Sequence, residues 1–187
     1  MKKTNAQNKR RNTLLAIVLI IIMFGSVLGV VVSSFGKEEN KQNQINYNNL
    51  KFIKQGDYWT LVGENTNFVF RYNPLETEEI NVELNLLSGY YNKPLYIFSE
   101  DEQAKQEIYK NLFYYNGLVQ RFQDACLEGE KCEGNFPFKN CQDNFIIIKR
   151  GESNIYQKEN CVFIEGLEEN LTKITDEFLF NLLDIRQ

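Results

Sequence analysis

The chain has 187 residues, a net charge of -4, four cysteines and no histidine. The lack of histidine excludes His-based catalytic triads, His-ligated zinc and histidine proton relays. The chain also lacks the G-x-x-x-x-G-K-[ST] and G-x-G-x-x-G loops that bind nucleotide phosphates.

Residues 13–36 are predicted to form a transmembrane helix. This stretch has no charged residue, and about 20 apolar helical residues suffice to cross a bilayer. Five basic residues precede it, namely Lys2, Lys3, Lys9, Arg10 and Arg11. The positive-inside rule therefore places residues 1–12 in the cytoplasm and the C-terminal part outside the cell membrane. The alternative is a cleaved signal peptide, although its apolar region is usually shorter.

The part of the chain beyond this span is acidic. Without the five N-terminal basic residues, the net charge falls from -4 to -9. Such a surface repels nucleic acid, which is therefore not an expected partner. Residues 37–46 are polar and are predicted to form a linker, whereas residues 47–187 are sufficient for one globular domain.

The domain is predicted to begin with an antiparallel β-meander. Its strands are expected over residues 51–54, 58–62 and 67–72, where β-branched and aromatic residues gather between tight turns. Apolar and polar residues also alternate over residues 80–86, which predicts a further strand. Residues 94–98 form a compact apolar run that is typical of a buried strand.

A long helix is predicted over residues 100–127. Ser99 and Glu102 have the spacing of a capping box at its start. Apolar residues then recur three or four positions apart, which is one face of a helix. They are Ala104, Ile108, Leu112, Tyr115, Val119, Phe122 and Cys126. Gly117 lies within this pattern, so the helix is expected to bend there.

The last third of the domain is predicted to contain strands and a C-terminal helix. Residues 145–148 and 161–164 are apolar on both faces, as central strands are, and residues 154–156 are expected to pair briefly. The helix is expected to begin after Asn170, since apolar residues follow at helical spacing to Ile185.

These elements predict the α/β class. We expect an N-terminal transmembrane helix followed by an extracytoplasmic mixed-sheet α/β sandwich with an N-terminal β-meander and a C-terminal helix. A right-handed crossover through the long helix would make the strands at residues 94–98 and 145–148 parallel.

The cysteines are predicted to form two disulfides, because an extracytoplasmic compartment is oxidising. If Cys126 ends the long helix, all four cysteines gather at the amino-terminal edge of the sheet. This geometry favours a Cys132–Cys141 bridge nested inside a Cys126–Cys161 bridge. Zinc is the alternative, but structural zinc ligands usually come in pairs two to four residues apart, and these cysteines do not.

Acidic residues are the remaining candidates for chemistry. Glu100 and Asp101 follow one predicted strand and Glu165 follows another, at the sheet edge where ligands commonly bind. With Lys149 they could bind Ca²⁺ or perform acid–base work. The favoured interpretation is that they are solvated loop and helix-cap carboxylates, so we assign no catalytic residue, metal or cofactor.

Two surface features complete the set of candidates. Aromatic residues could line a binding surface, although packing on the sheet faces is the favoured interpretation. They are Trp59, Tyr90, Tyr91, Tyr114 and Tyr156. Asn170 opens an N-x-T glycosylation sequon and also suits the N-cap of the last helix.

The chain resembles small, uncharacterised archaeal proteins that are anchored by a single membrane span. The basic N-terminus and span, the acidic domain, and the strings KNCQDNFIII, ENCVFIEG and LTKITDEFLFNLL carry this resemblance. It implies a location in the cell envelope and no assigned activity, and it supplies no catalytic residues.

The leading hypothesis is a non-enzymatic protein, anchored in the cell membrane, that binds a protein partner or takes part in envelope assembly outside the cell. The anchor and the absence of histidine and of a catalytic motif support it. The alternative is an extracytoplasmic enzyme that uses Glu100, Asp101 and Glu165, with or without a divalent cation.

Overall fold

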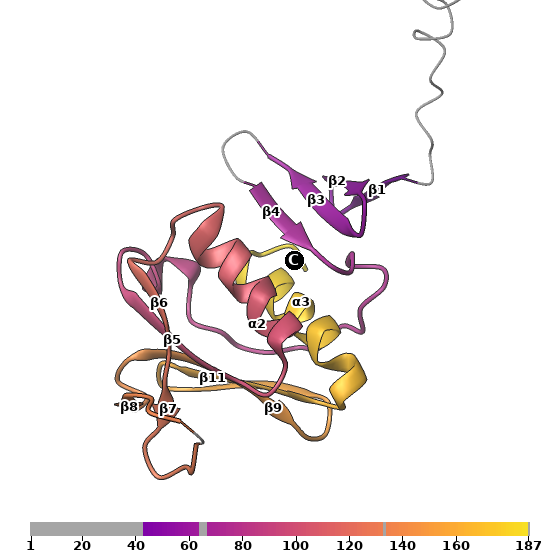
Figure 1. Cartoon of the computed structure of the whole chain (residues 1–187). Helices are drawn as coiled ribbons and strands as arrows, with labels where there is room; N and C mark the ends of the chain where they lie inside the picture. Colours follow the sequence, from indigo (N-terminus) through magenta and orange to yellow (C-terminus); the bar gives the residue numbers. More distant parts are fainter. Residues whose placement is uncertain (1–42, 64–66, 133, 187) are drawn as a thin grey trace, which may run out of the picture. The chain divides into compact units, whose positions relative to one another are not determined.

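The computed structural model describes residues 43–63, 67–132 and 134–186. The predicted cytoplasmic tail, the transmembrane helix and most of the linker lie outside these residues. Within the described ranges, no helix has the length and apolarity needed to cross a bilayer. The described residues form a mixed α/β structure with three sheets (Figure 1).

The first sheet is an antiparallel meander in the order β1-β2-β3-β4. Its strands are β1 (Gln44–Tyr47), β2 (Leu50–Gln55), β3 (Tyr58–Val62) and β4 (Asn67–Phe70). The predicted meander is confirmed, but β1 occupies part of the predicted linker. Asn48 and Asn49 both have positive φ, at 46° and 62°. Asparagine tolerates this geometry, so the two residues form a tight turn that returns β1 onto β2.

The second sheet has five strands in the order β10-β11-β9-β5-β6. They are β5 (Pro94–Ser99), β6 (Arg121–Asp124), β9 (Asn144–Arg150), β10 (Asn154–Lys158) and β11 (Cys161–Gly166). β5 runs parallel to β9 and β6, and β9 runs parallel to β11, whereas β10 is antiparallel to β11. The predicted parallel alignment and the mixed sheet are therefore confirmed.

The helical segments lie between these two sheets (Figure 1). They are α2 (Glu102–Ile108), the π-helical η3 (Tyr109–Tyr114) and α3 (Leu171–Leu182), with short 3-10 turns η2 (Leu87–Gly89) and η4 (Glu168–Asn170). The predicted C-terminal helix is confirmed.

The prediction of one helix over residues 100–127 is wrong. Asp101, not Ser99, is the N-cap of α2, and its carboxylate accepts a hydrogen bond from Ala104 N at 2.6 Å. Helical winding ends at Tyr114, and Gly117 then turns the chain with a φ of 56°. Phe122 continued the apolar pattern because it faces the core from strand β6.

The free edge of β4 is covered by side chains. Asn111 accepts a hydrogen bond from Val69 N at 2.8 Å and donates one to Val69 O at 2.7 Å. Asn116 forms the same pair of bonds with Asn67, at 3.0 and 3.4 Å. The two asparagines are five residues apart, which matches the i→i+5 repeat of a π-helix. They thereby satisfy an edge that would otherwise be free to pair with another chain.

The predicted strand over residues 80–86 is not part of any sheet. Ile80, Val82 and Leu84 do pack against the core, as the alternation indicated. The backbone finds side-chain partners instead of a neighbouring strand, because Asn85 N donates to Gln157 Oε1 at 2.8 Å and Ile80 N to Glu177 Oε1 at 3.3 Å.

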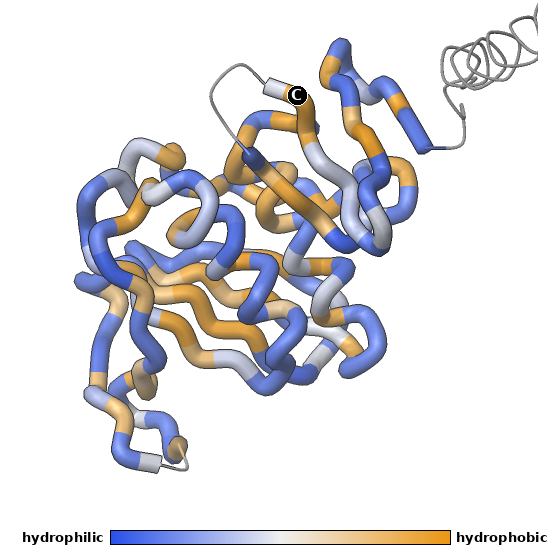
Figure 2. The backbone as a smooth tube through the Cα atoms, turned by 45° about the horizontal axis from the view of Figure 1, so that its top comes forward, coloured by the Kyte–Doolittle hydropathy of each residue, from blue (hydrophilic) through white to orange (hydrophobic). Residues whose placement is uncertain are grey.

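The main core fills the space between the two sheets and the helices. Phe70 and Phe180 illustrate it, with ring centroids 4.8 Å apart between β4 and α3. A second, smaller cluster lies on the opposite face of the five-stranded sheet, here called the outer face. It comprises Tyr96, Ala125, Phe145, Ile147, Cys161 and Phe163. Figure 2 shows that this sheet is hydrophobic along its central strands.

Candidate binding site on the outer face of the sheet

All four cysteines are disulfide-bonded, as predicted, but the predicted pairing is wrong. The bridges join Cys126 to Cys132 and Cys141 to Cys161, with Cα atoms 5.9 and 4.9 Å apart. The error follows from the helix prediction. Cys126 lies beyond the carboxyl end of β6, so it is not at the amino-terminal edge of the sheet, where Cys141 and Cys161 meet.

The Cys126–Cys132 bridge closes a small loop next to the outer face. β7 (Cys126–Leu127) pairs in parallel with β8 (Phe138–Lys139) in a two-stranded sheet at the base of this loop. A cavity of about 110 Å³ lies between the loop and the five-stranded sheet. Its lining residues are Phe98, Glu100, Leu127, Glu130, Lys131, Cys132, Ile147, Lys149 and Phe163.

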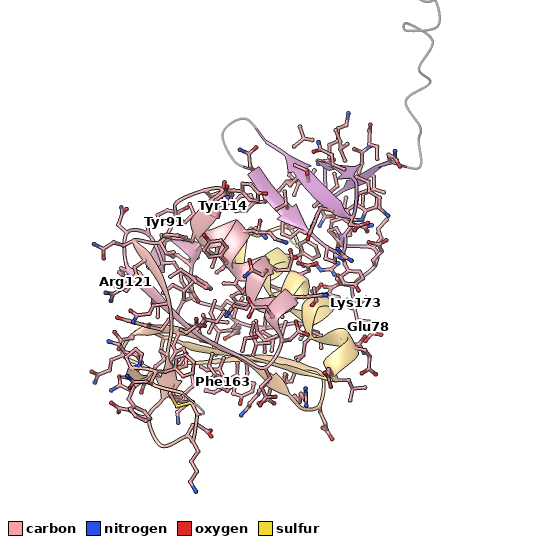
Figure 3. All side chains as sticks on the ribbon, in the orientation of Figure 1. Glu78, Tyr91, Tyr114, Arg121, Phe163 and Lys173 are labelled. Carbon is pink, nitrogen blue, oxygen red and sulfur yellow. A yellow bond between two sulfur atoms is a disulfide. The ribbon has the colours of Figure 1, made fainter. Side chains whose placement is uncertain are left out.

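The floor of the cavity is apolar because alternate residues of a strand face the same side. Phe98, Ile147 and Phe163 come from β5, β9 and β11, which are neighbours in the sheet. Tyr156 stacks on Phe163 with ring centroids 4.8 Å apart and planes 7° apart. Figure 3 labels Phe163 at this face. The floor is therefore a rigid aromatic and aliphatic surface.

Charged residues surround this apolar floor. Lys149 Nζ lies 3.4 Å from Glu165 Oε1 and 5.7 Å from the centroid of the Phe163 ring. Tyr156 donates a hydrogen bond to the same carboxylate at 3.2 Å. Partial burial, followed by the charge of Glu165, raises the pKa of the Tyr156 hydroxyl. Tyr156 therefore stays a neutral donor at physiological pH.

The three acidic candidates have separate structural roles. Glu100 Oε2 accepts a hydrogen bond from Arg150 N at 2.8 Å. Asp101 caps α2 and also accepts from Thr172 Oγ1 at 3.4 Å, whereas Glu165 pairs with Lys149. Residues 43–63, 67–132 and 134–186 contain no group of three or more His, Cys, Asp or Glu residues that could hold a metal ion.

The aromatic candidates divide into buried and exposed residues. Trp59 and Tyr90 are core residues, and burial raises the pKa of Tyr90. Tyr91, Tyr114 and Tyr156 are exposed, and of these only Tyr156 contacts the floor of the cavity. Figure 3 labels Tyr91 and Tyr114 elsewhere on the surface.

Asn170 occupies the N-cap position of α3, where it was expected. Its side chain makes no capping hydrogen bond, and the residue is partly exposed. It lines a shallow cavity of about 60 Å³ together with Glu78 and Lys173, which Figure 3 labels beside α3. Glycosylation of Asn170 stays a prediction.

Comparison with known proteins identifies no relative: no family model, no curated protein and no solved structure matches the chain. The functional argument therefore depends on the geometry alone. This geometry suits the binding of an apolar group in the cavity, with charged groups close by to orient it.

Proposed function

We propose that the chain is a single-pass cell-membrane protein whose residues 47–187 bind a protein partner or take part in envelope assembly outside the cell, without catalysis. The proposed occupant of the outer-face cavity is one aliphatic side chain of an extended partner segment. The resemblance of the whole chain to archaeal membrane-anchored proteins is part of the same proposal.

The observation that carries this proposal is the apolar cavity with a charged rim. An apolar cavity of about 150 Å³ is known to accept benzene, so 110 Å³ has room for a group of aliphatic side-chain size. Burial of such a side chain contributes about 1.5–3 kcal/mol. The rim carries Glu100 and Glu130 as well as Lys131 and Lys149, so it favours a partner segment with both signs of charge.

The two disulfides support a location outside the cell, since disulfides persist in oxidising compartments. The Cys126–Cys132 disulfide also holds part of the binding site in place, because Cys132 lines the cavity. The enzymatic alternative has less support, since the carboxylates of Glu100, Asp101 and Glu165 each accept hydrogen bonds from a different part of the protein.

The test uses full-length protein in detergent micelles and a library of synthetic peptides. Peptides that bind should shift the backbone NMR signals of Phe98, Ile147 and Phe163. Leu127→Phe would place a larger side chain in the cavity and should weaken binding at least tenfold. Leu86→Phe is the matched control, because Leu86 is exposed and remote from the cavity.

The proposal is wrong if no peptide with an aliphatic residue binds, or if Leu127→Phe and Leu86→Phe bind such peptides equally well. Signal shifts confined to another surface, such as the one around Tyr114, would also contradict it.

A further inference from the structure

Two buried carboxyl groups lie on α2 and α3, helices that pack against each other. Glu107 of α2 is 2% exposed and Asp176 of α3 is fully buried. One oxygen of each group has a protein partner: Glu107 Oε1 accepts from Lys110 Nζ at 3.0 Å, and Asp176 Oδ2 accepts from Tyr72 N at 2.8 Å. The other two oxygens, Glu107 Oε2 and Asp176 Oδ1, are buried and form no hydrogen bond of good geometry with the described residues. The backbone N–H of Arg71 is near enough to both carboxyl groups to lower their pKa, but burial outweighs this effect.

Two ionised carboxylates in this position would be strongly destabilising. Each unpartnered oxygen would carry the desolvation cost of a buried acceptor, and the two like charges would repel each other. One proton removes both costs, because a protonated carboxyl group donates a hydrogen bond to its ionised neighbour. Burial, and then the charge of Glu107, raise the pKa of Asp176 well above its ordinary value.

We propose that Glu107 and Asp176 hold one proton between them, and that this proton acts as a pH-sensitive latch between β4 and the helices. The latch is mechanical as well as electrostatic. Tyr72, whose amide donates to Asp176, lies two residues after the end of β4, so the carboxyl pair holds the end of the meander against α3. Loss of the proton to solvent leaves both carboxyl groups negatively charged where the end of the meander meets α3.

The charged groups that face the pair can balance only part of that charge. Lys110 is already paired with Glu107, and its ammonium lies 4.1 Å from the centroid of the Tyr58 ring. The guanidinium of Arg71 acts on Glu107 from the end of the meander, and it also lies 3.7 Å from Asp57. Both cations lower the pKa of Glu107, but burial outweighs them and the pKa is raised.

A solvent-accessible cleft gives the proton a route to the pair. The cleft has a volume of about 350 Å³, and Glu107 lies in its lining. Tyr58, Arg71 and Lys110 also line it. A proton can therefore exchange with Glu107 from the cleft, whereas Asp176 does not line it.

The direction of the pH dependence follows from the raised pKa of Asp176. The unfolded chain releases this proton near the ordinary value of 3.8, whereas the folded protein keeps it to a higher pH. The stabilisation is fully present below the unfolded value and is lost as the pH rises to the folded value. Across that window, the equilibrium constant for folding should fall about tenfold per pH unit from this proton alone.

The test compares full-length wild-type protein with Asp176→Asn. The amide should keep the bond from Tyr72 N through its oxygen and donate to Glu107 Oε2 through its nitrogen, so it replaces the proton at every pH. The ratio of the wild-type to the variant folding constant should therefore fall as the pH rises, by up to tenfold per unit. Asp124→Asn is the control, because Asp124 is half exposed and pairs with Lys105 on the surface.

Parallel pH profiles of wild type and Asp176→Asn would overturn the proposal. Infrared spectroscopy gives a second, independent measurement on the wild type, which should show a protonated carboxyl band at a pH above the ordinary values of 3.8 and 4.5 for the two groups. Its absence would mean that a bound water or cation satisfies the two oxygens instead. This measurement decides the matter even if Asp176→Asn fails to fold, and Glu107→Gln should remove the same band.

Discussion

Arg186 is predicted to be the most sensitive single position in the described part of the domain. Its guanidinium forms a bidentate ion pair with Glu177 of α3, and the two side chains are only 8% and 1% exposed. It also donates to the Tyr47 hydroxyl at 2.9 Å, to Pro74 O at 3.0 Å and to Thr77 Oγ1 at 2.6 Å. One side chain thereby joins α3, the strand β1 and the segment that follows the meander.

Arg186→Met keeps the aliphatic length of the side chain but leaves the Glu177 carboxylate buried and unpaired. Removal of one partner of a buried ion pair costs about 3–5 kcal/mol. For a domain of this size, each kcal/mol lowers the melting temperature by about 2–4 °C. We therefore expect a fall of roughly 6–20 °C in the melting temperature, measured by circular dichroism.

The matched control is Arg150→Met. Arg150 pairs with Glu168 at 3.1 Å, but the two side chains are 58% and 66% exposed. An exposed pair contributes about 0–1 kcal/mol. The double variant Arg186→Met with Glu177→Gln should recover part of the loss, because no unpaired charge is then buried at this position. The reasoning is refuted if Arg186→Met and Arg150→Met are equally stable.

Three further predictions concern stability. Replacement of Cys141 and Cys161 by serine should lower the free energy of unfolding by about 3 kcal/mol, measured by chemical denaturation. Replacement of Cys126 and Cys132 should lower it by about 2 kcal/mol, because this bridge closes a shorter loop. A larger loss for Cys126 and Cys132 would contradict this reasoning. Asn111→Ala should cost about 2–3 kcal/mol, since it removes both hydrogen bonds to Val69, and should increase self-association in analytical ultracentrifugation. Asn116→Ala should cost less, because Asn116 is only partly buried whereas Asn111 is fully buried. Gly166→Ala should cost about 1–3 kcal/mol by overpacking, because the new Cβ would overlap Ile174 Cδ1. The control is Gly89→Ala, whose new Cβ has no other atom within 4 Å, so its melting temperature should equal that of the wild type.

Local patterns predicted the elements whose determinants lie within a few residues. The runs at residues 58–62 and 145–148 are rich in strand formers, and both are strands. The apolar stripe after Asn170 is likewise buried from Leu171 to Ile185. These predictions succeeded because side-chain periodicity directly reports which face of an element is buried.

The failures involve segments whose conformation depends on distant partners. Helical spacing continued past Gly117 by coincidence, because Val119 in the bend before β6 and Phe122 in β6 pack in the same core. Asn111 and Asn116, which fix the end of the helical region, bond to β4 more than 40 residues earlier. The wrong disulfide pairing followed directly from that helix prediction.

The candidate site was only partly accessible to sequence reasoning. Phe98, Ile147 and Phe163 belong to predicted strands, but nothing local indicated that Leu127 would lie over them. Glu107 and Asp176 were missed because charged residues in amphipathic helices usually face solvent. The signal that identifies them is tertiary, namely two buried oxygens without partners.

The most direct test of the central claim, that this domain works outside the cell membrane, is protease digestion of intact cells or right-side-out vesicles. Because five basic residues precede the apolar span, we predict that protease removes the domain and spares the N-terminal tail. Non-reducing peptide mapping of the released fragment should show Cys126–Cys132 and Cys141–Cys161 bridges. A protected domain with four free thiols would contradict both the location and the proposed function.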